Sequence, residues 1–495
     1  MSPPSTAWGR PSVNNALWYN KDVILKHRDR ELLHFDWIGD VRVRVDRVND
    51  AERRFLPLEF GKERFGDPDA LRYPLEDWLA SRSAPVGRHF IRNLMDSLGL
   101  NINSSSYSRR VLEISRGLSL NDVYWVVSDG FTGTWAECNL YDNRFSEAMA
   151  EIAFTGRGRL DPRKASTSPE MTTNGMLPKC WVREEDGIYL YKGGTGADGG
   201  RRSAVEGLEP YSEFYAAQVA ETLGLRHVKY ELAKYKGRLC SKCKLFTSER
   251  YGYLPASKLP DRDVIANDVR FLDMFVFDAL IYNVDRHFGN FGYLIDNDAN
   301  EIVDVAPIFD NGNGFLPHLD VSARSAANNY YSIRNYVRDK HPAVFRHWLD
   351  IPYDLTEDLL ERVSKLEKFH FKKHRHYNWT DERLKVLTGF LQKRASDICK
   401  FRREVDKKDE QSLLLESAVS SENVGVKTSG GSGLNASEQR ATRLILRNSS
   451  VTEEEIANQL GVTIRQVERI IAALKKKAGL RRRGTDKVGE WYFDT

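Results

Sequence analysis

Apolar residues along the chain follow two periods, and these periods predict where strands and helices lie. Near the N-terminus, short stretches in which apolar and polar residues alternate, such as 41–45, predict strands. Over 74–118 the apolar residues recur at helical spacing and predict helices. We find no candidate chemistry in either stretch, so a packing or docking role is expected for this part.

The middle of the chain changes from strands to helices. From 121 to 258, short strands alternate with Gly-rich turns, and a single helix is predicted over 212–223, with Gly224 as its C-cap. Residues 262–403 are predicted to be mainly helical, apart from one hairpin over 291–305. A strand-rich part with one helix, followed by a helical part, is the element order of a bilobal kinase.

Length and composition limit the possibilities. A chain of 495 residues suggests two to four domains, and 41% hydrophobic residues allow substantial cores. The net charge of +4 is small against 74 basic and 70 acidic residues, so any nucleic-acid signal must be local. Five scattered cysteines indicate a reducing compartment, and no apolar run is long enough to cross a membrane. We therefore expect a soluble, cytoplasmic protein without membrane partners.

Candidate catalytic residues surround the predicted hairpin. Segment 283–290 places Asp285 five residues before Asn290, and Asp310 stands on the far side of the hairpin. Phosphoryl transfer of the kinase type needs one carboxylate to take the acceptor's proton, and an amide and a carboxylate to hold Mg²⁺ on the phosphates. The alternative is an ordinary polar loop with a structural Asp–Arg pair. The presence of Asp310 favours the kinase interpretation.

A second pair of residues precedes this set in the order that a kinase requires. Lys192 ends a predicted strand, and Glu213 lies in the first turn of the following helix. A strand lysine that pairs with a helical glutamate is how protein kinases place a cation on the α- and β-phosphates of ATP. The alternative is an exposed ion pair, which would contribute at most about 1 kcal/mol.

Two Gly-containing turns flank the Lys192 strand. The turn over 172–179 contains Thr172, Thr173 and Gly175, and its consecutive N–H groups could cradle phosphate oxygens. It matches neither a Walker A sequence nor GxGxxG. The more Gly-rich stretch over 193–200 comes after Lys192 and is interpreted as a connection to the Glu213 helix.

Taken together, segments 172–179, 209–215, 283–290 and 306–310 resemble the HipA-like serine/threonine kinases of bacterial toxin–antitoxin systems. The resemblance covers roughly 120–400. It implies an α+β, bilobal protein-kinase-like core that uses ATP and Mg²⁺ to phosphorylate a serine or threonine of a protein substrate. In this family a separate DNA-binding antitoxin restrains the kinase.

The resemblance also implies roles for individual residues. Asp285 would be the catalytic base, Asn290 and Asp310 the Mg²⁺ ligands, and Lys192 the phosphate contact paired with Glu213. The family's phosphate loop, which carries an autophosphorylated serine, would correspond to the turn with Gly175, where this chain has Thr172 or Thr173. The remaining positions expected to bind ATP lie at the adenine-binding hinge: Phe246, Thr247 and Ser248.

The C-terminal region is predicted to be a winged helix-turn-helix. Three helices are expected from Ser437 onward, with Thr452 and Thr463 capping the second and third, and a wing hairpin follows. Its outward and clustered polar residues are of the kind that contact DNA bases and phosphates. These candidate DNA-binding residues are Arg465, Gln466, Arg469, Lys475, Arg481, Arg482 and Arg483. A winged helix that contacts protein instead is the alternative.

These observations predict six regions. They are a flexible leader (1–20), a small N-terminal accessory domain (21–120), a kinase N-lobe (121–258), a helical kinase C-lobe (259–403), a flexible linker (404–436) and a winged helix-turn-helix (437–495).

Two other functions remain open from the sequence. The chain could be a transcriptional regulator whose kinase fold only senses nucleotide. It could also be a small-molecule or lipid kinase, because a DRHxxN segment such as 285–290 also occurs in phosphoinositide kinases.

Overall fold

A computed structural model of the chain describes residues 22–160, 167–196, 207–259, 265, 268–320, 330–345, 355–420, 436–447, 451–460, 462–483 and 489–493. The predicted leader (1–20) lies outside these residues. The chain divides into two compact units, one formed by 1–262 with 270–403 and the other by 263–269 with 404–495. No helix in the described part is both long and apolar enough to span a bilayer.

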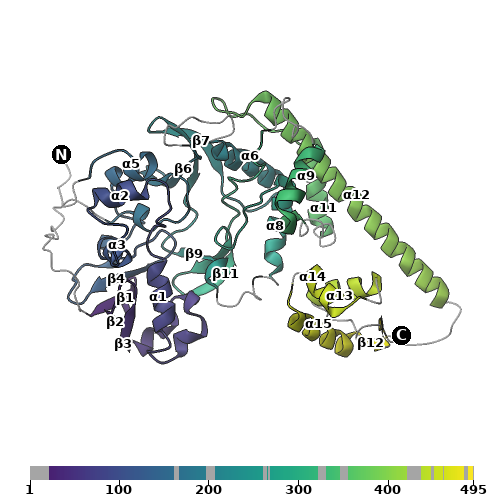
Figure 1. Cartoon of the computed structure of the whole chain (residues 1–495), viewed down its shortest axis with the longest axis horizontal. Coiled ribbons are helices and arrows are strands. Elements are labelled where there is room, and N and C mark those ends of the chain that lie inside the picture. Colours follow the sequence, from purple (N-terminus) through teal and green to yellow (C-terminus); the bar gives the residue numbers. More distant parts are fainter. Residues whose placement is uncertain are drawn as a thin grey trace. The chain divides into compact units, whose positions relative to one another are not determined.

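The N-terminal part of the first unit is built on a four-stranded antiparallel sheet of order β3-β2-β1-β4 (Figure 1). Apolar residues of its strands pack with α1 around Trp78, and a second cluster joins α2, α3 and α5. The elements are β1 (Val23–His27), β2 (Arg30–Trp37), β3 (Val43–Val48), α1 (Arg72–Ala80), α2 (Ile91–Ser97), α3 (Tyr107–Ser115), β4 (Tyr124–Ser128), α4 (Trp135–Cys138) and α5 (Glu147–Thr155). Because β4 pairs with β1, the predicted boundary between 120 and 121 cuts through one sheet.

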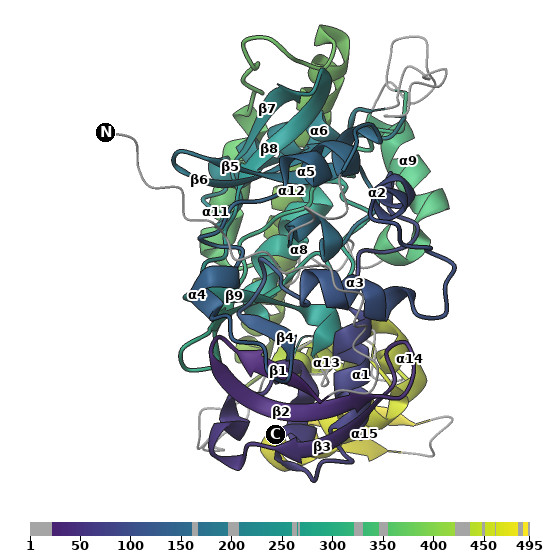
Figure 2. The same cartoon turned by 90° about the vertical axis from the view of Figure 1, so that its left-hand side faces the viewer.

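A second antiparallel sheet, of order β5-β6-β8-β7, carries the Lys192 strand. Cys240 and Cys243 of β8 lie on opposite faces: the first packs against α5 and the second against α6, so a helix covers each side (Figure 2). The elements are β5 (Lys179–Glu184), β6 (Gly187–Gly193), α6 (Glu209–Thr222), β7 (Tyr230–Tyr235) and β8 (Arg238–Lys244). Helix α6 corresponds to the helix predicted over 212–223 and begins three residues earlier.

A third sheet, of order β11-β10-β9, contains the predicted hairpin. Its strands are β9 (Tyr251–Pro255), β10 (Gly292–Asp296) and β11 (Glu301–Val305). The helices of this part of the chain are α8 (Leu272–Ile281), α9 (Tyr330–Lys340), α11 (Glu357–Ser364) and α12 (Asp381–Ser420). Since β9 pairs with β10, the predicted lobe boundary at 258/259 separates two strands of one sheet.

The predicted flexible linker is wrong in its first half. Helix α12 continues to Ser420, through residues 404–420 of the segment expected to be flexible. The charge run at 406–410 does not stop a helix, because Lys, Glu, Gln and Leu dominate this stretch and all favour helix. The Gly/Ser-rich part of the predicted linker falls within 421–435, outside the described residues.

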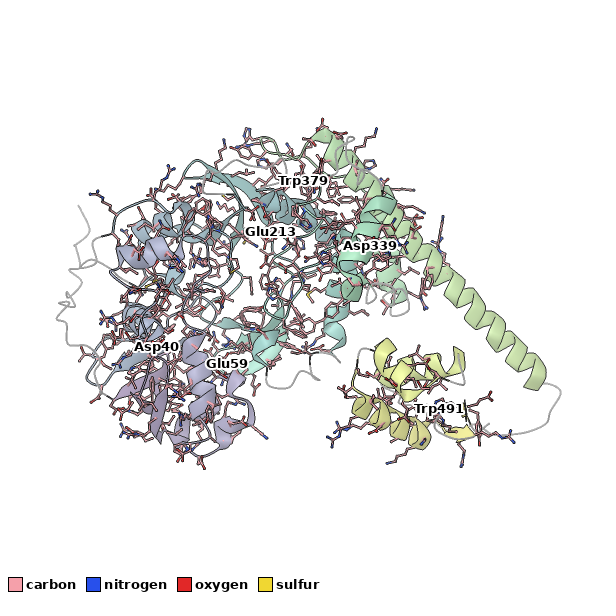
Figure 3. The ribbon with its side chains drawn as sticks, viewed as in Figure 1. Asp40, Glu59, Glu213, Asp339, Trp379 and Trp491 are labelled. Carbon is pink, nitrogen blue, oxygen red and sulfur yellow. The ribbon has the colours of Figure 1, made fainter. Side chains whose placement is uncertain are left out.

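The second unit ends in three helices and an antiparallel hairpin, in the order the sequence predicts: α13 (Ala436–Arg447), α14 (Glu453–Leu460), α15 (Ile464–Lys477), β12 (Leu480–Arg483) and β13 (Glu490–Phe493). Thr452 and Thr463 each form the predicted cap, with a glutamate or glutamine three residues on. Trp491 of β13 is buried in the core of these elements and donates to the carbonyl of Val451 at 2.8 Å (Figure 3).

Candidate active site

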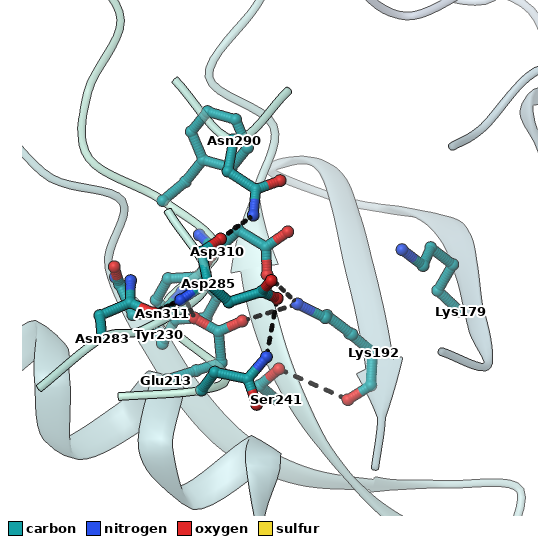
Figure 4. A network of polar contacts seen from close by, with 12 residues as sticks. Lys179, Lys192, Glu213, Tyr230, Ser241, Asn283, Asp285, Asn290, Asp310 and Asn311 are labelled. Carbon is teal, nitrogen blue, oxygen red and sulfur yellow. Dashed lines mark hydrogen bonds and ion pairs between the residues drawn. The ribbon is translucent and has the colours of Figure 1, made fainter. Parts of the chain in front are cut away.

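Lys192 lies near the end of β6 between two carboxylates (Figure 4). Its Nζ donates to Oε1 of Glu213 at 2.9 Å and to Oδ1 of Asp310. Lys192 is 8% exposed and Glu213 1%, so the pair is not the exposed ion pair that the sequence left open. The second carboxylate oxygen of Glu213 accepts a hydrogen bond from the backbone N–H of Asn311 at 2.7 Å. Glu213 thereby connects α6 to the residue that follows Asp310.

Burial and charge together set the protonation of these three groups. Burial lowers the pKa of Lys192, but Asp310 and Glu213 outweigh it and hold that pKa well above its usual range. Burial raises the pKa of Asp310, but Lys192 and then Lys179 bring it down to about 2. Burial raises the pKa of Glu213, and Lys192 opposes part of that rise. At neutral pH, Lys192 is therefore cationic and Asp310 anionic.

Asp285 and Asn290 lie in the loop between α8 and β10. The Nδ2 of Asn290 donates to the main-chain carbonyl of Asp285 at 3.1 Å, which directs the Oδ1 of Asn290 away from that contact. Asp285 itself is exposed, whereas Asn290 is buried. Both residues are drawn with Asp310 and Lys192 in one polar network (Figure 4). The structure therefore brings the segment of Asp285 and Asn290 together with Lys192 and Asp310, which lie in other parts of the chain.

Arg286 fixes this loop without engaging Asp285. Its guanidinium pairs with Asp278 of α8 at 2.8 and 2.9 Å. It also donates to the main-chain carbonyls of Asn290 and Phe309, at 3.1 and 2.6 Å. Arg286 thus forms a structural Asp–Arg pair, but its partner is Asp278, so this pair does not use the carboxylate of Asp285.

Asn313 is a site residue that the sequence analysis missed. Its Nδ2 donates to Oδ2 of Asp285 at 2.7 Å, across the loop that follows Asp310. The preceding Gly312 lies close to the ion pair, since a Cβ there would stand 3.4 Å from Oε1 of Glu213. The sequence Asp-Asn-Gly-Asn-Gly at 310–314 was a visible turn signal, but its spacing alone does not reveal which asparagine faces Asp285.

Oxygen donors at this site fit a hard divalent cation. The carboxylate of Asp310 and the free side of the Asn290 amide offer oxygen ligands, which Mg²⁺ prefers. The described residues contain no group of three or more His, Cys, Asp or Glu arranged to hold a metal. An ion at this position would therefore need ligands from elsewhere, and Mg²⁺ commonly takes them from nucleotide phosphates and water.

Lys179 is a second cation that the sequence analysis did not assign. It stands at the start of β5, directly opposite Lys192 on β6, and is buried. Its Nζ donates to the carbonyl of Asn174 at 3.0 Å and lies against Gly175, where any Cβ would collide with it. Gly175 also has a φ of +92°, which favours glycine. The backbone of the turn around Asn174 and Gly175 therefore encloses the side chain of Lys179, its last residue.

The two threonines of this turn use their hydroxyls within the protein. Thr172 is buried and donates from Oγ1 to the carbonyl of Leu118 at 2.7 Å. The hydroxyl of Thr173 donates to the carbonyl of Pro169 and accepts from the indole N–H of Trp181 at 3.0 Å. In this conformation both hydroxyls are therefore engaged in hydrogen bonds within the protein.

The predicted adenine hinge contains one apolar residue and two residues whose hydroxyls form hydrogen bonds within the protein. Phe246 packs against Phe309, with ring centroids 5.4 Å apart, directly before Asp310 in the chain. Thr247 is buried and donates its hydroxyl to the carbonyl of Leu120. The hydroxyl of Ser248 accepts from the backbone N–H of Tyr251 at 3.0 Å. Of the three side chains, Phe246 is therefore the one suited to contact a base.

Some candidate DNA-binding side chains of the second unit are exposed, and others make contacts within the fold. Arg465 and Arg469 are exposed and lie one turn apart on α15. Gln466 is committed to the helix cap, because its Oε1 accepts from the backbone N–H of Thr463 at 2.8 Å.

In the hairpin, Arg482 packs over the ring of Trp491, 4.5 Å from its centroid. Arg481 and Arg483 are exposed on the other face of the strand. Lys475 is exposed and lies 5.7 Å from the same ring centroid. Gln466 and Arg482 thus have roles in the fold that the sequence did not predict.

Comparison with known proteins relates part of the chain to serine/threonine kinases. No protein-family model matches it. A segment of 136 residues is 32% identical to the protein named serine/threonine-protein kinase CtkA of Helicobacter pylori strain J99, covering 22% of this chain and 42% of CtkA. The chain thus spans less than half the length of that curated relative. The match confirms the resemblance to serine/threonine kinases over that segment.

Two solved structures are similar at low identity. A crystal structure of a Helicobacter pylori proinflammatory kinase, CtkA, covers 46% of this chain and 95% of its own, with 19% identity and a TM-score of 0.33. The second is a Shewanella oneidensis MR-1 toxin–antitoxin complex of HipA, HipB and operator DNA. The match covers 76% of this chain and 96% of the matched chain, with 12% identity and a TM-score of 0.41. Both TM-scores lie below 0.5.

Proposed function

We propose that the chain is an ATP- and Mg²⁺-dependent serine/threonine protein kinase of the HipA-like type. The observation that carries the proposal is the buried junction of Lys192 with Glu213 and Asp310, beside the loop that holds Asp285 and Asn290. A buried, doubly paired lysine next to an exposed carboxylate suits a site in which a cation holds phosphate and a base faces the acceptor. The sequence match to CtkA supports the same class.

In this proposal each residue has a distinct task. Lys192, held by Glu213, contacts the phosphates of ATP, and Lys179 beneath the 172–179 turn supplies a second positive charge. Asp285 accepts the proton of the acceptor hydroxyl, which reaches it from solvent because Asp285 is exposed. Catalysis then comes mainly from positioning and from charge neutralisation at the transferred phosphoryl group.

Asn290 and Asp310 would hold Mg²⁺, and the ion, when bound, neutralises charge on the phosphate oxygens. Phe246 and Phe309 would form one wall for the adenine ring. In the present geometry Asp310 accepts a hydrogen bond from Lys192. One of its oxygens is thereby oriented, and a cation and a lysine can share a carboxylate in this way.

We further propose that the C-terminal elements form a winged helix-turn-helix that binds DNA. Arg465 and Arg469 on one face of α15 would reach into the major groove, while Arg481 and Arg483 contact phosphates from the hairpin. A protein substrate with a serine or threonine acceptor, and an antitoxin partner, follow from the HipA-like resemblance. The DNA-binding unit would replace or supplement the DNA contact of such an antitoxin.

Transfer of label from γ-labelled ATP tests the kinase proposal. The purified full chain is incubated with Mg²⁺ and either a protein substrate pool or the chain itself, and Asp285→Asn is compared with wild type. We expect the variant to lose about a hundredfold or more of the transfer rate, as expected for removal of a general base. Asp304→Asn is the matched control, because Asp304 is an exposed carboxylate on the neighbouring strand β11 that pairs with Arg226.

The result also separates the other functions. Nucleotide and DNA binding without transfer to any acceptor would support a nucleotide-sensing regulator and contradict the kinase. Transfer to small molecules or lipids but to no protein would support the third possibility. Equal loss in Asp285→Asn and Asp304→Asn would mean that Asp285 has no special role.

A further inference from the structure

We propose that Arg88, in the N-terminal part of the chain, is a positioning residue that holds the 172–179 turn in the shape that receives phosphate. The inference depends on the proposed kinase function for its consequence, but its structural basis is independent of it. It assigns a function to a region in which the sequence showed no chemistry.

Arg88 reaches both ends of the turn at once. Its Nη1 donates to the carbonyls of Glu170 and Thr173, at 2.7 and 3.2 Å, and its Nη2 donates to the carbonyl of Lys179 at 3.0 Å. The guanidinium therefore connects a residue before the turn, one near its start and one at its end to a single rigid group. Arginine suits this task because its planar fork carries several donors in fixed directions, whereas lysine has a single nitrogen.

The arrangement fixes Lys179 in particular. Arg88 holds the main-chain carbonyl of Lys179, while the Nζ of Lys179 curls back to the carbonyl of Asn174 inside the turn. Lys179 also stands in register with Lys192. Movement of the turn would thus displace one of the two lysines proposed to contact phosphate.

Burying the charged guanidinium of Arg88 costs free energy that other interactions must offset. The residue is 3% exposed, and burial lowers its pKa. Its hydrogen bonds go to neutral carbonyls rather than to a carboxylate, although the side chain of Glu170 lies close enough to oppose part of the shift. A buried charge held by carbonyls is stabilised less than one paired with a carboxylate. We infer that the organisation of the turn offsets this cost.

Neighbouring contacts reinforce the same junction. The backbone N–H of Ala84 donates to the carbonyl of Met171 at 2.7 Å, and that of His89 donates to the carbonyl of Met176 at 3.0 Å. Both donors flank Arg88 in the chain. The segment 84–89 is therefore joined to Met171 and Met176 by its backbone and to the turn by the side chain of Arg88.

Amide hydrogen exchange of the nucleotide-free full chain tests the proposal directly. We expect peptides over 172–178 to exchange about tenfold faster in Arg88→Lys than in wild type, since loss of charged hydrogen bonds lowers the cost of local opening. Affinity for Mg²⁺ and a non-hydrolysable ATP analogue should fall by about tenfold, with kcat at saturating ATP within about twofold of wild type. Such a split between affinity and kcat would not follow from general destabilisation.

Arg82→Lys is the matched control. Arg82 is buried in the same region and bonds to Asp122 at 2.6 Å and to the carbonyl of Gly117 at 3.3 Å, neither of which belongs to the turn. It should lose stability without faster exchange over 172–178. Unchanged exchange over 172–178 in folded Arg88→Lys would overturn the proposal, as would equal acceleration in both variants. Failure of wild type to bind nucleotide would instead contradict the proposed function, and the exchange result would still decide the role of Arg88.

Discussion

Lys179 and Lys192 stand directly opposite each other on β5 and β6, and both are buried. Like charges in such a cross-strand pair destabilise a sheet. Glu213 and Asp310 compensate the charge of Lys192. Burial, and then the nearby charge of Lys192, lower the pKa of Lys179 to about 7. A bound polyanion would offset this repulsion between the two lysines.

Nucleotide binding is therefore expected to take up a proton. At pH 8, above its pKa of about 7, Lys179 is mostly neutral in the free protein, while bound phosphates favour its cationic form and raise that pKa. Affinity should fall as pH rises above 7, because each binding event must then protonate Lys179. Calorimetric titration at pH 8 in buffers of different ionisation enthalpy measures the uptake. Identical binding enthalpies in all buffers would contradict it, and Lys179→Met should abolish the buffer dependence.

Replacing Glu213 by glutamine should weaken both the fold and the site. Lys192 would keep Asp310 but lose its second carboxylate, and we expect the free energy of unfolding to fall by about 1–3 kcal/mol. Nucleotide affinity should fall as well, because Lys192 is then drawn toward Asp310. Denaturant titration and nucleotide binding are measured together. Glu221→Gln, an exposed change on the same helix, serves as the control, and equal effects of the two changes would argue against a special pair.

Asn313→Ala should slow phosphoryl transfer without weakening ATP binding. The lost hydrogen bond to Oδ2 of Asp285 frees the proposed base to rotate, which we expect to lower kcat by about tenfold, the equivalent of one hydrogen bond. Steady-state kinetics and nucleotide titration of the same preparation check this. A drop in affinity with kcat unchanged would place Asn313 at the nucleotide rather than at the base.

Substitutions of the three hairpin arginines should have different effects, depending on which face of strand β12 each side chain occupies. Arg481→Ala and Arg483→Ala should weaken DNA binding for all sequences and each reduce the salt slope by about one. Arg482→Ala should mainly lower stability, because Arg482 packs over Trp491. Fluorescence anisotropy at several salt concentrations, with thermal unfolding of each variant, measures both. A salt slope altered by Arg482→Ala alone would reverse the assignment.

Much of the site followed from chain order and residue type. Asp285, Asn290 and Asp310 are spaced around a hairpin that the alternation of 291–305 predicts, and β10 and β11 form there. The Lys192 strand and the Glu213 helix were recognisable from their local periods. The local sequence was sufficient to predict these elements because the spacing of their apolar residues is typical of a strand or a helix.

The missed features are those that depend on contacts between distant segments. Arg88 and the 172–179 turn are more than eighty residues apart, and the bond between Asn313 and Asp285 spans twenty-eight. No period connects such positions. The boundaries at 120 and 258 failed for the same reason, since β4 and β9 join sheets whose other strands lie far along the chain.

The linker error has a different cause. The predicted linker begins at 404, although Lys and Glu are good helix formers and α12 runs without a break from Asp381. Helix propensity summed along the stretch would have predicted the continuation to Ser420.

A structure of the full chain with a non-hydrolysable ATP analogue and Mn²⁺, located by its anomalous signal, tests the central claim most directly. We predict one ion with Oδ1 of Asn290 and the carboxylate of Asp310 as ligands at about 2.1 Å, phosphates on Lys192 and Lys179, and Asp285 facing the γ-phosphate. An ion and triphosphate bound elsewhere, with Asn290 and Asp310 still in their present contacts, would contradict the account.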